Sequence, residues 1–100
     1  RLLRTRLAAK QSEDCLYLNV RTVSSLPVLV YIHGGDYHDG AGASRPFYLS
    51  NALPIKGDVV LVTFNYRLGL LGHFCHPDLS EEAEAAGRPA VSGNYSILDQ

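Results

Sequence analysis

Residues 28–35 read VLVYIHGG, and residues 59–64 read VVLVTF. Both stretches contain a continuous run of apolar residues rich in valine, with no alternation of apolar and polar positions. Such runs are typical of strands that are buried on both faces of a parallel sheet. We therefore predict strands over 28–32 and 59–64 in an α/β sheet, with a loop and a helix between them.

The composition is that of a globular chain. Hydrophobic residues make up 46% and charged residues 19%, which excludes an intrinsically disordered or collagen-like protein. Nine Lys and Arg against ten Asp and Glu leave a net charge of −1. That charge provides no electrostatic basis for binding nucleic acid or an anionic membrane surface. No apolar run approaches the roughly 18 residues that span a bilayer. We therefore expect neither nucleic acid nor a membrane as a partner.

The two ends of the sequence suggest a piece of a longer protein. The chain starts at Arg1, contains no methionine and stops at Gln100 within a structured pattern. We expect a fragment, and the alternative is a processed mature domain.

Turn-forming residues divide the rest of the chain into short elements. The alternation in CLYLNV predicts a strand over 15–20, and Pro46 favours a short helix over 47–53 because proline suits a first helical turn. Residues 56–58 are interpreted as a turn, and the glycines within 69–72 as an irregular stretch.

The last quarter of the chain is helix-prone. The acidic stretch LSEEAEAA predicts a helix over 79–86, with Ser80 as its N-cap and glutamates in its first turn. Gly87 would end that helix, and Ile97 and Leu98 would start another.

Ligands bind such sheets beyond the carboxyl ends of the strands. Here those ends carry His33–Asp36 and Asn65–Arg67. The paired glycines of the first group allow a sharp turn and leave backbone N–H groups accessible, and converging N–H donors can stabilise an oxyanion. A tight turn that simply needs glycine is the more common use of such a pair. A lone histidine such as His33 could act as a base, but more often it is a hydrogen-bonded structural residue.

Other residues carry chemistry of less specific kinds. His73–His76 (HFCH) offers three soft ligands, but a zinc site normally takes four in spaced pairs, so we expect no metal. Asn94–Ser96 fits the N-glycosylation pattern, which matters only in a secreted eukaryotic protein. Cys15 and Cys75 could pair, or each could be a small buried hydrophobe. Four charged residues beside apolar runs are either solvated or form buried ion pairs: Glu13, Asp14, Arg67 and Asp99.

Four blocks of the sequence form a more specific pattern. They are SEDCLYLNV at 12–20, VYIHGG at 30–35, VVLVTFNYRLGLLG at 59–72 and GNYSILDQ at 93–100. In this order they resemble a signature, the oxyanion-hole segment, the strand and loop that follow it, and the Gly-Asn-aromatic-Gly-Leu-Leu-Asp-Gln block of one family. The family is that of the type-B carboxylesterases, which includes the carboxylesterases and cholinesterases.

The resemblance implies an α/β-hydrolase fold, with a mostly parallel central sheet of which residues 1–100 form the N-terminal fragment of a single domain. It also implies hydrolysis of small carboxylic esters through an acyl-enzyme and a Ser-Glu/Asp-His triad, without a cofactor or metal. The serine of that family lies in a Gly-x-Ser-x-Gly turn, a pattern that this sequence does not contain. We therefore assign no triad residue to this chain, and His33 is not the triad histidine.

The oxyanion hole does carry over from the resemblance. The backbone N–H groups of Gly35 and Asp36 match the family's donors, and Gly34 would serve the turn. Asp36 departs from the family, which usually has glycine there. Its N–H remains, but a carboxylate aimed into the hole would repel the developing negative charge. The alternative is therefore a non-catalytic binding or adhesion domain on the same fold, as in relatives resembling neuroligin.

The resemblance implies structural roles as well. Arg67 would pair with Asp99 in a buried salt bridge, and Glu13 with an arginine upstream of the chain. Cys15 would bond to an upstream cysteine, so a bridge from Cys15 to Cys75 is not predicted. Ser96 stands where the family usually has glycine, and we attach little weight to it.

Overall fold

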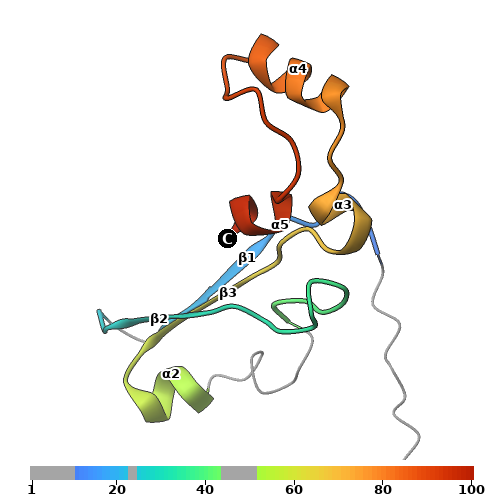
Figure 1. Ribbon diagram of the computed structural model, residues 1–100. Helices are drawn as coiled ribbons and strands as arrows, with labels where there is room; N and C mark the ends of the chain where they lie inside the picture. The colour runs from blue at the N-terminus through green and yellow to red at the C-terminus, as the bar shows by residue number, and fades with distance from the viewer. Residues whose placement is uncertain (1–10, 23–24, 44–51) are drawn as a thin grey trace, which may run out of the picture.

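The computed structural model describes residues 11–22, 25–43 and 52–100 (Figure 1). Its centre is a three-stranded sheet in the order β1-β3-β2. The strands are β1 (Leu18–Arg21), β2 (Val28–Tyr31) and β3 (Val60–Phe64). β2 runs parallel to β3, whereas β1 runs antiparallel to it. The chain therefore crosses over from β2 to β3 as an α/β unit does, and β1 makes the sheet mixed.

β3 is the central strand and holds the core. Its Leu61 is 1% exposed and its Thr63 is 2% exposed, while the residues between and beside them are half-buried. Leu61 lies opposite Arg21 on one side and Leu29 on the other. The strand predicted over 59–64 is present as β3 from Val60, because an apolar β-branched run suits a strand paired on both edges. Its prediction as buried on both faces is wrong, because Val60, Val62 and Phe64 are only half-buried.

The two outer strands differ from expectation. The strand predicted over 15–20 begins three residues later, at Leu18. The strand predicted over 28–32 is present as β2, but its prediction as buried on both faces is wrong: Val28 is 64% exposed and Val30 is 53% exposed. The reason is that β2 pairs with a neighbour on one edge only, and its Val28 face is left uncovered in the described part of the chain.

Helices α2 (Ala52–Gly57) and α3 (Gly69–His73) flank β3 along the chain. Most of the helix predicted over 47–53 lies outside the described residues. The turn predicted at 56–58 is wrong for Lys56 and Gly57, which end α2, and the chain reverses at Asp58 with a φ of +49°. The prediction of an irregular 69–72 is also wrong, because these glycines lie inside α3.

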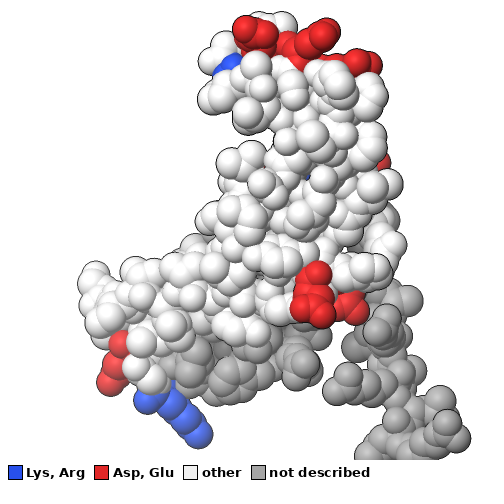
Figure 2. Space-filling model, viewed as in Figure 1, with Lys and Arg blue, Asp and Glu red and all other residues white. Residues whose placement is uncertain are grey.

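Helices α4 (Pro77–Ala85) and α5 (Tyr95–Asp99) complete the chain. The N-cap of α4 is His76, whose ring nitrogen Nδ1 accepts the Asp78 N–H at 3.3 Å. The prediction of Ser80 as the N-cap is therefore wrong, because Pro77 already occupies the first helical turn. α5 starts two residues before the predicted Ile97. In Figure 1, α4 projects away from the sheet, and Figure 2 shows acidic side chains gathered on its outer side.

None of the helices within 52–100 is both long and apolar enough to cross a bilayer.

One face of the sheet is apolar and open. Register places the alternate residues of the three strands on this face, which we call the open face: Leu18, Val20, Val28, Val30, Val60, Val62 and Phe64. Leu18 and Val20 of β1 are 65% and 55% exposed. An uncovered apolar surface of this kind favours binding of dyes and of other apolar surfaces.

We expect the 100-residue chain expressed by itself to bind the dye ANS strongly and to self-associate, because the β1 and β2 residues of its open face are more than half exposed. ANS fluorescence and light scattering measure this. Val28→Thr combined with Leu18→Thr should lower both signals. A monomer that melts cooperatively and binds no ANS would contradict the expectation.

Candidate functional site

The site predicted at His33–Asp36 is part of a longer loop. This glycine loop (residues 33–42) follows the carboxyl end of β2. Gly35, Asp36 and Tyr37 have φ values of +134°, +54° and +57°. The loop then closes on itself, because the Gly35 carbonyl accepts the N–H groups of His38 at 2.9 Å and Asp39 at 3.1 Å. The structure thus has a tight turn here, which is closed by hydrogen bonds between backbone groups.

Gly35 is a position that requires glycine. A Cβ there would lie 1.8 Å from the Asp39 carbonyl oxygen, and the φ of +134° is one that side chains rarely adopt. A Cβ on Gly34 would meet nothing within 4 Å. The role of Gly34 in the turn stays a prediction, and the two neighbouring glycines offer a matched pair for substitution.

His33 is a buried structural residue. It is 4% exposed, and its ring stacks on Tyr66 with centroids 4.3 Å apart and planes 13° apart. The ring nitrogen Nδ1 lies 3.1 Å from the Gly34 carbonyl oxygen, and Nε2 has no partner among the described residues. The His33 ring is therefore packed against Tyr66 beneath the protein surface, and it is not exposed to solvent as a base.

The second predicted group, Asn65–Arg67, lies directly against the glycine loop. The Tyr66 hydroxyl donates to the His33 carbonyl at 2.5 Å, and the Gly69 N–H donates to the Tyr37 carbonyl at 2.6 Å. Burial, followed by the nearby Tyr37, raises the pKa of Tyr66, so its hydroxyl keeps its proton and remains a donor at neutral pH. The structure therefore joins the two strand ends that the sequence singled out.

Arg67 and Asp99 form the predicted ion pair. Arg67 Nε donates to Asp99 Oδ2 and Nη2 to Oδ1, both at 2.8 Å, and the Arg67 backbone N–H donates to Oδ2 at 2.9 Å. The Asp99 side chain is 7% exposed and that of Arg67 is 36% exposed. These hydrogen bonds lower the pKa of Asp99. The guanidinium carbon also lies 4.5 Å from the centre of the Tyr95 ring, within range of a cation–π contact.

Ser96, which sequence reasoning set aside, is part of this support. It is 0% exposed, and its hydroxyl donates to the Arg67 carbonyl. Gly72 of α3 faces it so closely that a Cβ there would lie 2.1 Å from Ser96 Oγ. The sequence signal for this role is the serine at a position where the family usually has glycine, because a hydroxyl in a buried position needs a hydrogen-bond partner.

Asp36 is exposed, and within the described ranges its carboxylate makes no hydrogen bond or ion pair. Figure 2 shows acidic atoms at the surface where the glycine loop lies in Figure 1, and Asp36 and Asp39 are the acidic residues of that loop. Two open hollows, of about 270 and 360 Å³, lie instead beside β1, and both are lined by Tyr17 and Asn65. Neither hollow is lined by Gly34, Gly35 or Asp36.

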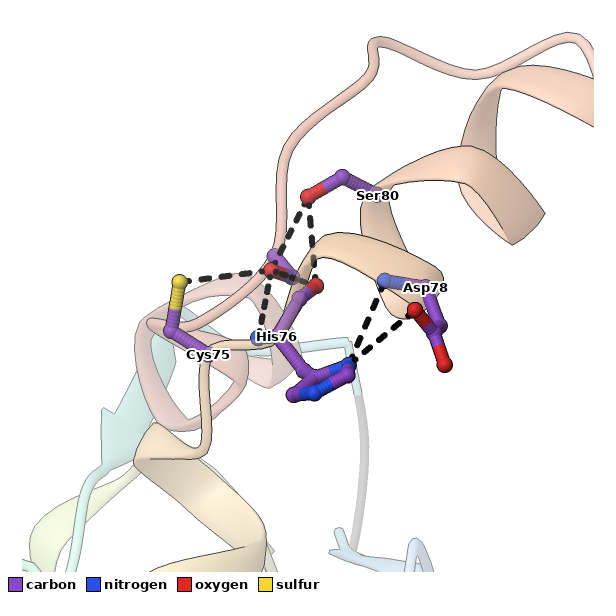
Figure 3. A network of polar contacts seen from close by, with 5 residues as sticks. Cys75, His76, Asp78 and Ser80 are labelled. Carbon is purple, nitrogen blue, oxygen red and sulfur yellow. Dashed lines mark hydrogen bonds and ion pairs between the residues drawn. The ribbon is translucent and has the colours of Figure 1, made fainter.

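Cys75 and His76 of the HFCH segment belong to a capping network at the start of α4 (Figure 3), whereas His73 Nδ1 lies 3.2 Å from the Gly69 carbonyl oxygen within α3. The Ser92 hydroxyl donates to the His76 carbonyl at 2.9 Å, and it lies 3.0 Å from Ser80 Oγ and 3.3 Å from Cys75 Sγ. His76 Nδ1 is engaged by Asp78 at the start of α4. Among the described residues, no three His, Cys, Asp or Glu side chains come together as a metal site.

The remaining sequence candidates stay apart from the site. Cys15 and Cys75 are both free, the first half-buried and the second exposed. Asn94, in the segment that fits the N-glycosylation pattern, is exposed. The pairing of the exposed Glu13 with an upstream arginine stays a prediction.

Known proteins share this arrangement. Residues 2–100 match the profile of the Carboxylesterase family. Fumonisin B1 esterase of Sphingopyxis macrogoltabida is 48% identical over 97 residues, which cover 92% of this chain and 17% of that protein. The solved structure of a PNB esterase superposes with a TM-score of 0.70 at 42% identity, over 93% of this chain and 19% of the other. Neuroligin-2 of Mus musculus is 33% identical over 115 residues, covering 90% and 12%.

The chain thus spans less than a fifth of the length of these relatives. The superposition confirms the predicted fold class: the sheet and helices described here are a small part of an α/β-hydrolase fold.

We expect Asp99→Asn to lower the free energy of unfolding of the complete gene product by about 1–3 kcal/mol near pH 7, because it leaves the half-buried Arg67 without a counter-charge. Urea denaturation measures this. A folded-state pKa that is lowered contributes stability above the pKa of an unfolded aspartate, and that contribution is lost as pH falls through the folded value.

The variant should therefore lose less stability than the wild type on acidification below about pH 4. Glu81→Gln, at an exposed position of α4, is the control and should follow the wild type. Parallel acid profiles for wild type and Asp99→Asn would contradict the assignment.

Proposed function

Because the chain belongs to the carboxylesterase family, we propose that the complete protein is a serine hydrolase of small carboxylic esters, to which these residues contribute the oxyanion hole. The backbone N–H groups of Gly35 and Asp36 are the proposed donors. The observation that carries this proposal is the conformation of the glycine loop, where consecutive residues with positive φ are held rigidly at the end of a parallel strand. Fold similarity alone would not carry it, because one fold hosts many functions.

The chemistry explains why a rigid loop matters. A serine oxygen adds to the ester carbonyl, and the carbonyl oxygen becomes an oxyanion in the tetrahedral intermediate. Donors that already point at that oxygen stabilise the charge without reorganising during the reaction. Loss of one such donor costs about 10²–10³ in rate. We place the nucleophile, its base and its acid outside residues 1–100.

The glycine loop is suited to this task by its anchoring. His33, its first residue, is held by the hydroxyl and the ring of Tyr66. The Tyr37 carbonyl accepts the Gly69 N–H, and the Gly35 carbonyl closes the turn within the loop. These contacts use carbonyl oxygens and ring faces of the loop. None of these contacts uses the N–H of Gly35 or of Asp36.

Asp36 is compatible with catalysis in this geometry. The donor is a backbone N–H, which the side chain does not alter, and aspartate tolerates the left-handed conformation better than most residues. Its carboxylate is exposed. Water therefore screens its charge from an oxyanion, in contrast to a carboxylate buried in the hole.

The second candidate is a non-catalytic binding domain on the same fold. The identity with neuroligin-2 and the aspartate at position 36 favour it. Sequencing the complete gene separates the two, because the catalytic proposal requires a Gly-x-Ser-x-Gly turn followed by an acid and a histidine. A gene that lacks that serine would replace the first proposal by the second.

Hydrolysis of p-nitrophenyl acetate and butyrate by the complete gene product tests the proposal directly. We expect activity that Gly35→Ala reduces by about 10²-fold or more in kcat, because the new Cβ collides with the Asp39 carbonyl and shifts the donors. Gly34→Ala, which meets open space, is the control and should keep most of the activity. Equal losses in both variants would refute the role of Gly35.

Asp36→Asn tests the effect of the acidic side chain. We expect kcat to change by less than about threefold, since the backbone donor is kept and the exposed charge is screened. Steady-state kinetics at low and high salt measures this. A gain above about tenfold, largest at low salt, would mean instead that the carboxylate repels the oxyanion.

A further inference from the structure

We propose that Asn65 is a positioning residue for the oxyanion hole: its side-chain amide ties the far end of the glycine loop to the segment that leads into β1. This inference rests on the proposed function, because it concerns how that loop is held for the reaction. Asn65 lies immediately after β3, the central strand of the sheet.

The amide of Asn65 uses both of its ends. Its Oδ1 accepts the N–H of Gly42, the last residue of the glycine loop, at 2.8 Å. Its Nδ2 donates to the Cys15 carbonyl at 2.9 Å. Its backbone N–H also donates to the Tyr17 carbonyl at 2.9 Å. One half-buried side chain therefore joins two segments that lie 27 positions apart in the chain, at 15 and 42.

Gly42 is a firm point of attachment. It is buried against the backbone of β3, where a Cβ would lie 2.7 Å from the Phe64 carbonyl oxygen. The other end of the loop is fixed at His33 by Tyr66. Neighbouring residues, Asn65 and Tyr66, thus hold the two ends of the loop, while its donors at Gly35 and Asp36 lie between them.

We expect Asn65 to affect the stabilisation of the transition state more than the affinity for the bound ester. Asn65 is not proposed to touch the substrate. It sets where the loop backbone lies, and a displacement of about 1 Å can lower a rate by as much as about 10²-fold. An interaction that matters mainly once negative charge has developed appears in kcat and leaves KM nearly unchanged.

The test uses the complete gene product and three substitutions of Asn65. Asn65→Ala removes both side-chain bonds. The side chain of Asn65→Ser is too short to make either bond, but it keeps a hydroxyl at this half-buried site. This variant replaces the alanine variant if the latter does not fold. Asn65→Asp keeps an acceptor for the Gly42 N–H, but it replaces the donor to the Cys15 carbonyl by a charged oxygen.

We expect Asn65→Ala or Asn65→Ser to lower kcat about ten- to hundredfold with KM changed less than about threefold. Affinity for a trifluoromethyl ketone, which forms a tetrahedral oxyanion adduct, should fall by the same factor as kcat/KM. Asn65→Asp should recover part of this loss. Asn19→Ala is the matched control, because Asn19 also donates its amide to β3, at Thr63 Oγ1 over 3.4 Å, and this bond does not involve the glycine loop.

A readout independent of activity separates this inference from the proposed function. Hydrogen exchange of the amides at 34–42 should accelerate in Asn65→Ala and Asn65→Ser but not in Asn19→Ala. A wild type without esterase activity would refute the proposed function, whereas hydrogen exchange would still show whether the Asn65 side chain holds the loop. Unchanged loop exchange, or equal losses in substrate affinity and in ketone affinity, would overturn the role of Asn65.

Discussion

The bidentate ion pair between Arg67 and Asp99 holds residues 65–69, which contact the glycine loop. Arg67 gives its side chain and its backbone N–H to the Asp99 carboxylate, and its carbonyl accepts the Ser96 hydroxyl. Its backbone polar groups are thereby satisfied by α5 instead of by a strand neighbour. This keeps the chain ordered beyond the end of the sheet, where Tyr66 and Gly69 contact the glycine loop.

The geometry of the glycine loop follows from that arrangement. Tyr66 supports His33, Gly69 binds Tyr37, and Asn65 binds Gly42. Asp36 and Tyr37 are not glycines, and their positive φ values are unfavourable for the isolated backbone by about 1–2 kcal/mol each. The contacts to residues 65–69 offset this strain. A loop held so closely has its amides oriented before any ligand arrives, which is what an oxyanion hole requires.

The pattern of apolar and charged residues predicted the elements whose formation depends mainly on nearby residues. The valine-rich run after Lys56 became β3, and the acidic stretch after Pro77 became α4, because strand and helix preferences agree there with the tertiary fold. Pattern failed at α3, where Gly69 and Gly72 suggested an irregular loop. Gly72 is inside a helix because α5 packs against it, and this close approach leaves no room for a side chain beside Ser96. No local signal carries that information.

The amino-acid sequence alone predicted the family and singled out the two strand ends that the structure joins. Four ordered blocks were readable because they depend on residue identity and spacing, and the Arg67–Asp99 pair was implied by the family resemblance that those blocks carry. Tertiary structure decided what those residues do for one another: the stacking of His33 on Tyr66, the double contact of Asn65, and the burial of Ser96. Such contacts join segments between 23 and 50 positions apart, so their geometry depends on how the strands pair in the sheet.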